Sequence, residues 1–271
     1  MFVTTEGIDH HVQIADVSGN LTRVDASRPI VAMIHGSGID TFVSFYFSLH
    51  FPLAKLGFTN IMYDRRAHGR TPGPAGTLTI QQGSADLAGI LDAVGATTPV
   101  HLIGTSYGAA IAIDFAVHYP GRTASVALLD GGPGTEAWRD FMCKLFGRAL
   151  DKNDAEMNRI LASKGSTPQD RRLADSIAMV ARTTILQDTT ASRVVSASML
   201  EQLTIPILAI YGARGGAVES SRHELEVAPN FEAQVIPDVG HYLFFEAPAA
   251  LRQVLSEFYL RHESRLVEQG A

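Results

Sequence analysis

A serine at a predicted strand-to-helix junction has the surroundings that nucleophilic chemistry requires. Residues 104–108 read GTSYG, with an apolar run at 99–103 before them and an Ala-rich apolar run at 109–116 after them. A chain that turns from strand to helix at Ser106 tolerates only small residues two positions away, and both are Gly. The hydroxyl would then project over the helix N-terminus, where backbone N–H groups favour developing negative charge. We predict that Ser106 is a nucleophile.

The segments around Ser106 predict an α/β fold. Continuous apolar runs are typical of strands buried on both faces, and they occupy 29–34, 59–64, 99–103, 124–130 and 206–212. Segments with helical spacing separate or follow them, at 41–56, where Pro52 should bend the helix, and at 78–94, 219–228 and 248–263. Short strands at 2–5 and 10–15 should form an antiparallel edge, before a polar loop over 18–28. We therefore expect a mostly parallel central sheet of about eight strands with helices on both faces.

The alternation of strand and helix stops after residue 132. Residues 133–200 contain no convincing strand but several amphipathic stretches, at 136–150, 153–163, 168–184 and 190–200. We expect these stretches to form a helical lid over the ends of the strands. The predicted organisation is an α/β core of residues 1–132 and 201–271 with a lid of residues 133–200 inserted between its halves.

Composition excludes several classes of partner. The formal net charge is −6 and no block of Lys or Arg occurs, which disfavours nucleic acids and anionic membranes as partners. The single Cys143 excludes an internal disulfide and a Cys-rich zinc site. Residues 2–6 lack the features of a signal peptide, and no run of 18 apolar residues occurs. We expect a cytoplasmic protein without membrane insertion; the sequence is compatible with a homo-oligomer.

Four motifs in this order resemble those of the α/β-hydrolase fold superfamily, and the resemblance covers nearly the whole chain apart from the lid. They are HGSG at 35–38, DRRAHGRT at 64–71, GTSYG at 104–108 and VGH at 239–241. The second motif departs from the family pattern D-x-R-G-x-G-x-S because Ala67 replaces a Gly. The resemblance implies that Ser106 is the nucleophile and His241 its base. It also implies an oxyanion hole made by the N–H groups of Ser37 and Tyr107, with Gly38 as the alternative to Ser37.

The acid of the implied triad is where the chain departs from the common family layout. Most members place an Asp in a G-x-x-D arrangement that begins here at Gly212, but this chain has Gly215 at the Asp position. A minority place the acid at the end of the preceding strand, where Asp130 stands. We therefore predict Asp130 as the acid and keep Glu219, on the same loop as Gly215, as the alternative. A Ser–His dyad without an acid is the third possibility.

The predicted chemistry is acyl transfer to water. A Ser at the strand-to-helix turn disfavours epoxide hydrolase and haloalkane dehalogenase chemistry, because in both of those families the reaction proceeds through an ester on a carboxylate at this turn. We expect hydrolysis of an ester, thioester or lactone of a small to medium, largely apolar substrate through an acyl-serine intermediate, without metal or cofactor. The resemblance leaves three alternatives: a carbon–carbon bond hydrolase, a cofactor-free dioxygenase in which His is the base and Ser only positions the substrate, and a non-catalytic binding protein.

Overall fold

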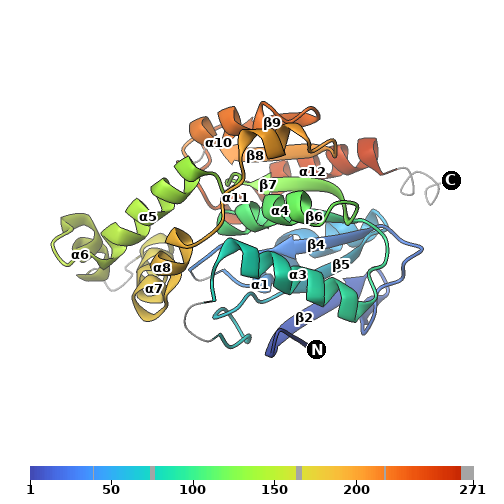
Figure 1. Ribbon diagram of the computed structural model, residues 1–271, viewed down its shortest axis with the longest axis horizontal. Coiled ribbons are helices and arrows are strands. Elements are labelled where there is room, and N and C mark those ends of the chain that lie inside the picture. The colour runs from blue at the N-terminus through green and yellow to red at the C-terminus, as the bar shows by residue number, and fades with distance from the viewer. Residues whose placement is uncertain (39, 74–76, 163–166, 217, 264–271) are drawn as a thin grey trace.

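One twisted sheet forms the centre of the molecule (Figure 1). The computed structural model describes residues 1–38, 40–73, 77–162, 167–216 and 218–263. Within these ranges nine strands pair in the order β1-β2-β5-β4-β6-β7-β8-β9, with β3 paired to β2. The strands are β1 Phe2–Thr5, β2 Ile8–Asp16, β3 Gly19–Leu21, β4 Ile30–Ile34, β5 Thr59–Tyr63, β6 Val100–Thr105, β7 Thr123–Leu129, β8 Ile207–Gly212 and β9 Phe231–Ile236.

The pairing confirms the predicted α/β class with a mostly parallel sheet. From β5 to β9 every neighbouring pair along the strand order is parallel. β2 pairs antiparallel with β1, β3 and β5, and so forms the antiparallel edge. β3 lies in the stretch predicted as a loop over 18–28. Its three residues are too few to show a period of two, and their pairing with residues 14–16 of β2 defines the strand instead.

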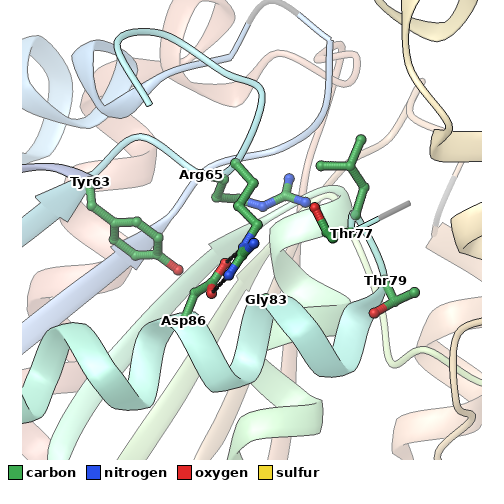
Figure 2. Close-up of a pocket in the computed structure, with 8 residues that line it drawn as sticks. Tyr63, Arg65, Thr77, Thr79, Gly83 and Asp86 are labelled. Atoms are coloured by element: carbon green, nitrogen blue, oxygen red, sulfur yellow. Dashed lines mark hydrogen bonds and ion pairs between the residues drawn. The ribbon is translucent and has the colours of Figure 1, made fainter. Parts of the chain in front are cut away.

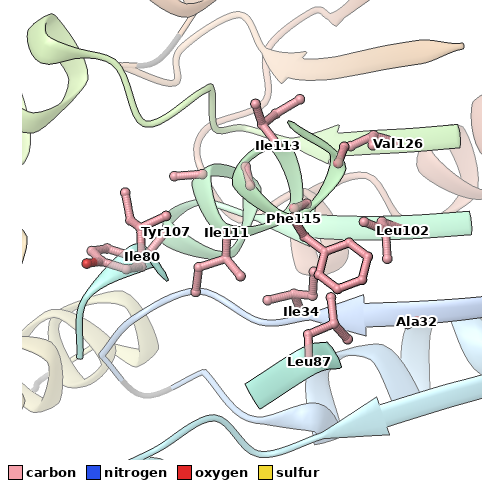
Figure 3. Close-up of a cluster of buried hydrophobic side chains, with 14 of the residues drawn as sticks. Ala32, Ile34, Ile80, Leu87, Leu102, Tyr107, Ile111, Ile113, Phe115 and Val126 are labelled. Atoms are coloured by element: carbon pink, nitrogen blue, oxygen red, sulfur yellow. The ribbon is translucent and has the colours of Figure 1, made fainter. Parts of the chain in front are cut away.

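Helices cover both faces of the sheet. On one face α3 (Ile80–Val94) and α4 (Tyr107–His118) bury residues against β4, β6 and β7, as the side chains of Leu87, Phe115 and Leu102 illustrate (Figure 3). The opposite face is covered mainly by α1 (Phe42–Phe45), α2 (Phe51–Lys55), α11 (Leu243–Glu246) and α12 (Pro248–His262). The remaining core helix is α10 (Val218–Leu225). Because both faces are covered, the strands read as continuous apolar runs.

The helix predicted over 41–56 is irregular just before its proline. A π-helical turn, η1 (Tyr46–His50), separates α1 from α2, and Pro52 lies in the first turn of α2. Proline has no N–H to donate to the carbonyl four residues earlier, and its ring crowds that carbonyl. The wider π turn accommodates this local conflict.

Among the described residues, the segment between β7 and β8 forms a series of helices, and all but the last of them lie together at one end of the molecule (Figure 1). They are α5 Glu136–Leu150, α6 Ala155–Ala162, α7 Pro168–Arg182, α8 Ile185–Thr190 and α9 Ala197–Glu201. Polar contacts join this group to the core: Arg193 donates two hydrogen bonds of 2.6 Å to the buried Asp114 of α4. The Asp188 carboxylate also accepts from the N–H of Leu78, before α3, at 2.9 Å. In the described part of the chain, no helix has both the length and the apolar composition that a membrane span needs.

Candidate active site

Ser106 occupies a strained turn between β6 and α4. Its φ of 51° and ψ of −116° lie in a region that side-chain-bearing residues adopt only when the surrounding structure imposes it. The close packing around the turn explains the two flanking glycines. A Cβ at Gly104 would lie 2.5 Å from the carbonyl oxygen of Gly108, and a Cβ at Gly108 would overlap the carbonyl oxygen of Ile34. Strand, turn and helix therefore fit together only with glycine at both positions.

His241 and Asp130 form a hydrogen-bonded pair, although 110 residues separate them in the sequence. Asp130 directly follows β7, and its Oδ2 accepts from Nδ1 of His241, in the loop between β9 and α11, at 2.5 Å. Its other carboxylate oxygen accepts from the backbone N–H of Gly212 at 3.2 Å. The Asp130 side chain is fully buried, whereas the His241 ring is 42% exposed. A carboxylate at Nδ1 keeps the proton of the neutral imidazole there and leaves Nε2 free to accept one.

Gly215 makes space for the Asp130 carboxylate. A Cβ built at Gly215 would overlap Oδ1 of Asp130 and lie 2.7 Å from Oδ2. Position 215, where the resemblance led us to expect the acid in the common layout, is therefore next to the carboxylate that approaches His241 from β7. The side chain of the alternative acid, Glu219 of α10, lies outside the described residues.

The charges around His241 raise the pKa of its imidazole. Partial burial of the side chain lowers the pKa, but the hydrogen bond and the negative charge of Asp130, together with the charges of the Asp40 and Glu246 carboxylates, outweigh this effect. The pKa therefore lies above the ordinary value of 6.5. The imidazolium is the form that these carboxylates stabilise, as proton transfer from a serine would require.

Sequence reasoning did not identify Asp40 and Glu246. The Asp40 carboxylate accepts from the Gly36 N–H at 3.3 Å and from the Ser44 hydroxyl at 3.2 Å, and burial raises the pKa of Asp40. Glu246 accepts from the N–H groups of the residues on both sides of His241, at 2.9 and 3.3 Å. In the sequence, Asp40 could have been noticed as an acidic residue two positions after the HGSG motif. Glu246, five residues after His241, gave no comparable signal.

The predicted oxyanion loop lies beside Ser106. β4 and β6 are parallel neighbours, so the HGSG segment and the serine turn follow adjacent strand ends. A Cβ at Gly36 would lie 3.2 Å from the Cβ of Ser106. Tyr107 is the first residue of α4, so its N–H has no acceptor within the helix. Among the described residues, the N–H of Ser37 makes no hydrogen bond either.

A cavity of about 240 Å³ opens onto the serine turn and the His241–Asp130 pair. Ser106, Asp130 and His241 line it on the side of the sheet. α5 lines it with the apolar side chains of Trp138, Phe141, Met142 and Leu145. The structure thus brings three of the predicted site residues, Ser106, His241 and Asp130, to one largely apolar cavity. Within the described ranges, at this cavity and elsewhere, no three His, Cys, Asp or Glu side chains are arranged to hold a metal ion.

Comparisons with known proteins agree with this architecture. A curated relative from Paraburkholderia phymatum, a 2-hydroxy-6-oxononadienedioate/2-hydroxy-6-oxononatrienedioate hydrolase, is 24% identical over 255 residues, which cover 86% of this chain and 88% of the relative. A thermophilic esterase from Thermogutta terrifontis superposes with a TM-score of 0.71 at 20% identity, covering 97% of this chain and 99% of the esterase. The enol-lactonase from Burkholderia xenovorans LB400 gives a TM-score of 0.69 at 17% identity, over 96% and 100% of the two chains. The model of the alpha/beta hydrolase family matches residues 31–254, and the chain belongs to this family.

Proposed function

We propose that this α/β hydrolase is a serine hydrolase that cleaves an ester, thioester or lactone through an acyl-serine intermediate. The observation that carries the proposal is the pairing of His241 with the buried Asp130 at a cavity that a strained serine also lines. A serine hydroxyl is a poor nucleophile until an imidazole removes its proton, and the carboxylate sets the tautomer that can do so.

In the proposed reaction, Oγ of Ser106 attacks the substrate carbonyl carbon while Nε2 of His241 takes the hydroxyl proton. The carbonyl oxygen becomes an oxyanion, which the N–H groups of Ser37 and Tyr107 stabilise. The imidazolium, held by Asp130, returns its proton to the leaving alcohol or thiol as the carbon–oxygen or carbon–sulfur bond breaks. Water then attacks the acyl-serine by the same steps, which releases the acid and restores the hydroxyl.

The cavity favours a small or medium, largely apolar acyl group. Its volume of about 240 Å³ lies just below the range of volumes typical of ligand pockets, and α5 contributes an apolar wall. We propose that α5 to α8 act as the lid of this cavity. The structural likeness to an esterase and an enol-lactonase is consistent with an acyl substrate.

Hydrolysis of a carbon–carbon bond is the second candidate. The Paraburkholderia relative is named as a hydrolase of 2-hydroxy-6-oxononadienedioate, and this chain matches it over most of its length. A serine–histidine pair can serve both reactions, so the substrate distinguishes them.

The test is active-site labelling combined with a substrate series. A fluorophosphonate probe should label the folded wild-type protein and the control variant Ser198→Ala, on the exposed surface of α9, but not Ser106→Ala. p-Nitrophenyl esters should be hydrolysed, with kcat/KM highest for short or medium acyl chains. Absence of labelling at Ser106 in folded protein would overturn the acyl-enzyme proposal. Turnover of a 2-hydroxy-6-oxo-dienoate without ester hydrolysis would favour carbon–carbon cleavage, and oxygen uptake with a heteroaromatic substrate would favour a dioxygenase.

A further inference from the structure

A buried arginine lies directly behind the HGSG loop. Arg65 is the second residue after β5 (Figure 2). It is only 5% exposed. Among the described residues, no carboxylate oxygen lies within 4 Å of its guanidinium, although buried arginines are usually paired with one. The neighbouring Arg66 follows the usual pattern: it forms two hydrogen bonds, of 2.5 and 2.7 Å, to Asp86 of α3. The different environment of Arg65 calls for another explanation.

Arg65 contacts both residues predicted to supply the oxyanion-hole N–H groups. Its Nη1 group donates to the carbonyl oxygens of Gly36 at 3.0 Å and His35 at 3.3 Å, and lies 3.4 Å from the Ser37 hydroxyl oxygen. Its guanidinium carbon lies 4.9 Å from the centre of the Tyr107 ring, a cation–π distance. Burial lowers the pKa of Arg65, but a guanidinium stays protonated in proteins, so the group carries its positive charge.

The carbonyl of Gly36 is held by two donors. The backbone N–H of Arg65 donates to Nε2 of His35 at 2.9 Å, which places the His35 proton on Nδ1. Nδ1 lies 2.7 Å from the Gly36 carbonyl oxygen and therefore donates to it, beside the Nη1 group of Arg65. Burial and the nearby charges of His68 and Arg65 hold the pKa of His35 well below 6.5, which keeps the ring neutral with this single Nδ1 proton.

The geometry of the peptide bond transmits this constraint to Ser37. The carbonyl of Gly36 and the N–H of Ser37 belong to one planar trans peptide, so they point in opposite directions. Holding the oxygen toward Arg65 directs the Ser37 N–H away from Arg65. A cation at the oxygen also draws electron density through the amide and makes its N–H a stronger donor, because hydrogen bonds in chains polarise one another.

We propose that Arg65 is a positioning residue, whose buried charge holds and polarises the Gly36–Ser37 peptide so that the Ser37 N–H is preorganised for a substrate oxyanion. The inference rests on the proposed function, since an oxyanion arises only if Ser106 attacks a carbonyl. Arg65 itself does not touch the substrate. Its effect should therefore fall on the transition state and leave ground-state binding unchanged.

The test compares Arg65→Met, Arg65→Gln and Arg65→Lys with the surface variant Arg122→Met, whose native partner is the exposed Asp92. With a p-nitrophenyl ester, Arg65→Met and Arg65→Gln should lower kcat about 10²-fold with KM within about threefold, as loss of an oxyanion-hole donor does. Arg65→Lys, which keeps the charge but not the planar guanidinium that reaches both carbonyls, should retain about a tenth of wild-type kcat. Affinity for a trifluoromethyl ketone, which mimics the oxyanion, should fall in parallel with kcat/KM, and Arg122→Met should change neither.

The outcomes separate this inference from the proposed function. If the wild-type protein neither hydrolyses esters nor reacts with a fluorophosphonate, both the proposed function and this inference are refuted. An active wild type with a folded Arg65→Met or Arg65→Gln variant of unchanged kcat overturns the inference alone. If both neutral variants fail to fold, Arg65→Lys decides: unchanged kcat and ketone affinity together with a lower melting temperature assign Arg65 a structural role. A lower kcat at constant KM, matched by weaker ketone binding, supports positioning.

Discussion

Replacing Asp130 by Asn should disable the proposed catalysis without disturbing the fold. Asn has nearly the same shape as Asp, so it fits the space beside Gly215. It has only one side-chain acceptor oxygen, however, and the Asp130 carboxylate lies between two donors, the Gly212 N–H at 3.2 Å and Nδ1 of His241 at 2.5 Å. Either the amide NH₂ faces the Gly212 N–H, or it faces His241 and favours the tautomer with the proton on Nε2. In the second arrangement His241 cannot accept the Ser106 proton.

The expected loss in kcat is about 10³-fold, or about 4 kcal/mol of transition-state stabilisation. The corresponding Asp→Asn change in the serine-protease triad costs about 10⁴-fold. We expect less here because the His241 ring is 42% exposed, so water screens part of the interaction.

The assay is steady-state hydrolysis of a p-nitrophenyl ester by wild type, Asp130→Asn, Glu219→Gln and the exposed control Asp140→Asn, each checked by thermal melting. Asp140→Asn and Glu219→Gln should retain at least half of wild-type kcat. A loss below tenfold in folded Asp130→Asn protein would refute the reasoning, and a larger loss in Glu219→Gln would transfer the role of the acid to Glu219.

Three further predictions follow from the contacts of the site. The Asp130 hydrogen bond raises the pKa of His241 above 6.5, and only the neutral ring can act as a base. A plot of kcat/KM against pH should therefore increase along a titration curve whose midpoint lies above 6.5. Glu246→Gln should move that midpoint to lower pH, and an unchanged or higher midpoint would contradict the assigned cause. Gly215→Ala places a methyl group against the Asp130 carboxylate and should lower kcat at least tenfold. The control Gly147→Ala, where a Cβ has open space, should leave kcat unchanged. Equal kcat values for the two variants would show that the carboxylate can shift without cost. Ala67 has a φ of 58°, so Ala67→Gly should raise the free energy of unfolding, measured in urea, by about 0.5–1 kcal/mol. The control Ala93→Gly, on the exposed face of α3, should lower it by about 1 kcal/mol. A less stable Ala67→Gly variant would show that the backbone strain is absent.

Much of the fold could be predicted because the local pattern of apolar and polar residues along the chain indicates which segments are buried. The apolar runs before Ser106 and Asp130 reflect strands covered on both faces, and these became β6 and β7. The antiparallel edge was also predicted, but β3 was not, since three residues show no period. The π turn before Pro52 likewise depends on how a local conflict is relieved, which spacing does not encode.

The sequence by itself determined the type of most elements and the glycine-flanked turn at Ser106, because backbone sterics and burial act within a few residues of one position. It also indicated Asp130, since Gly215 leaves the common acid position without a carboxylate. Only the tertiary structure decided that Asp130 reaches Nδ1 of His241 and that Arg65 lies behind the HGSG loop. These contacts join residues that are distant in the chain, and they depend on the order of the strands in the sheet, on which side-chain spacing carries no information.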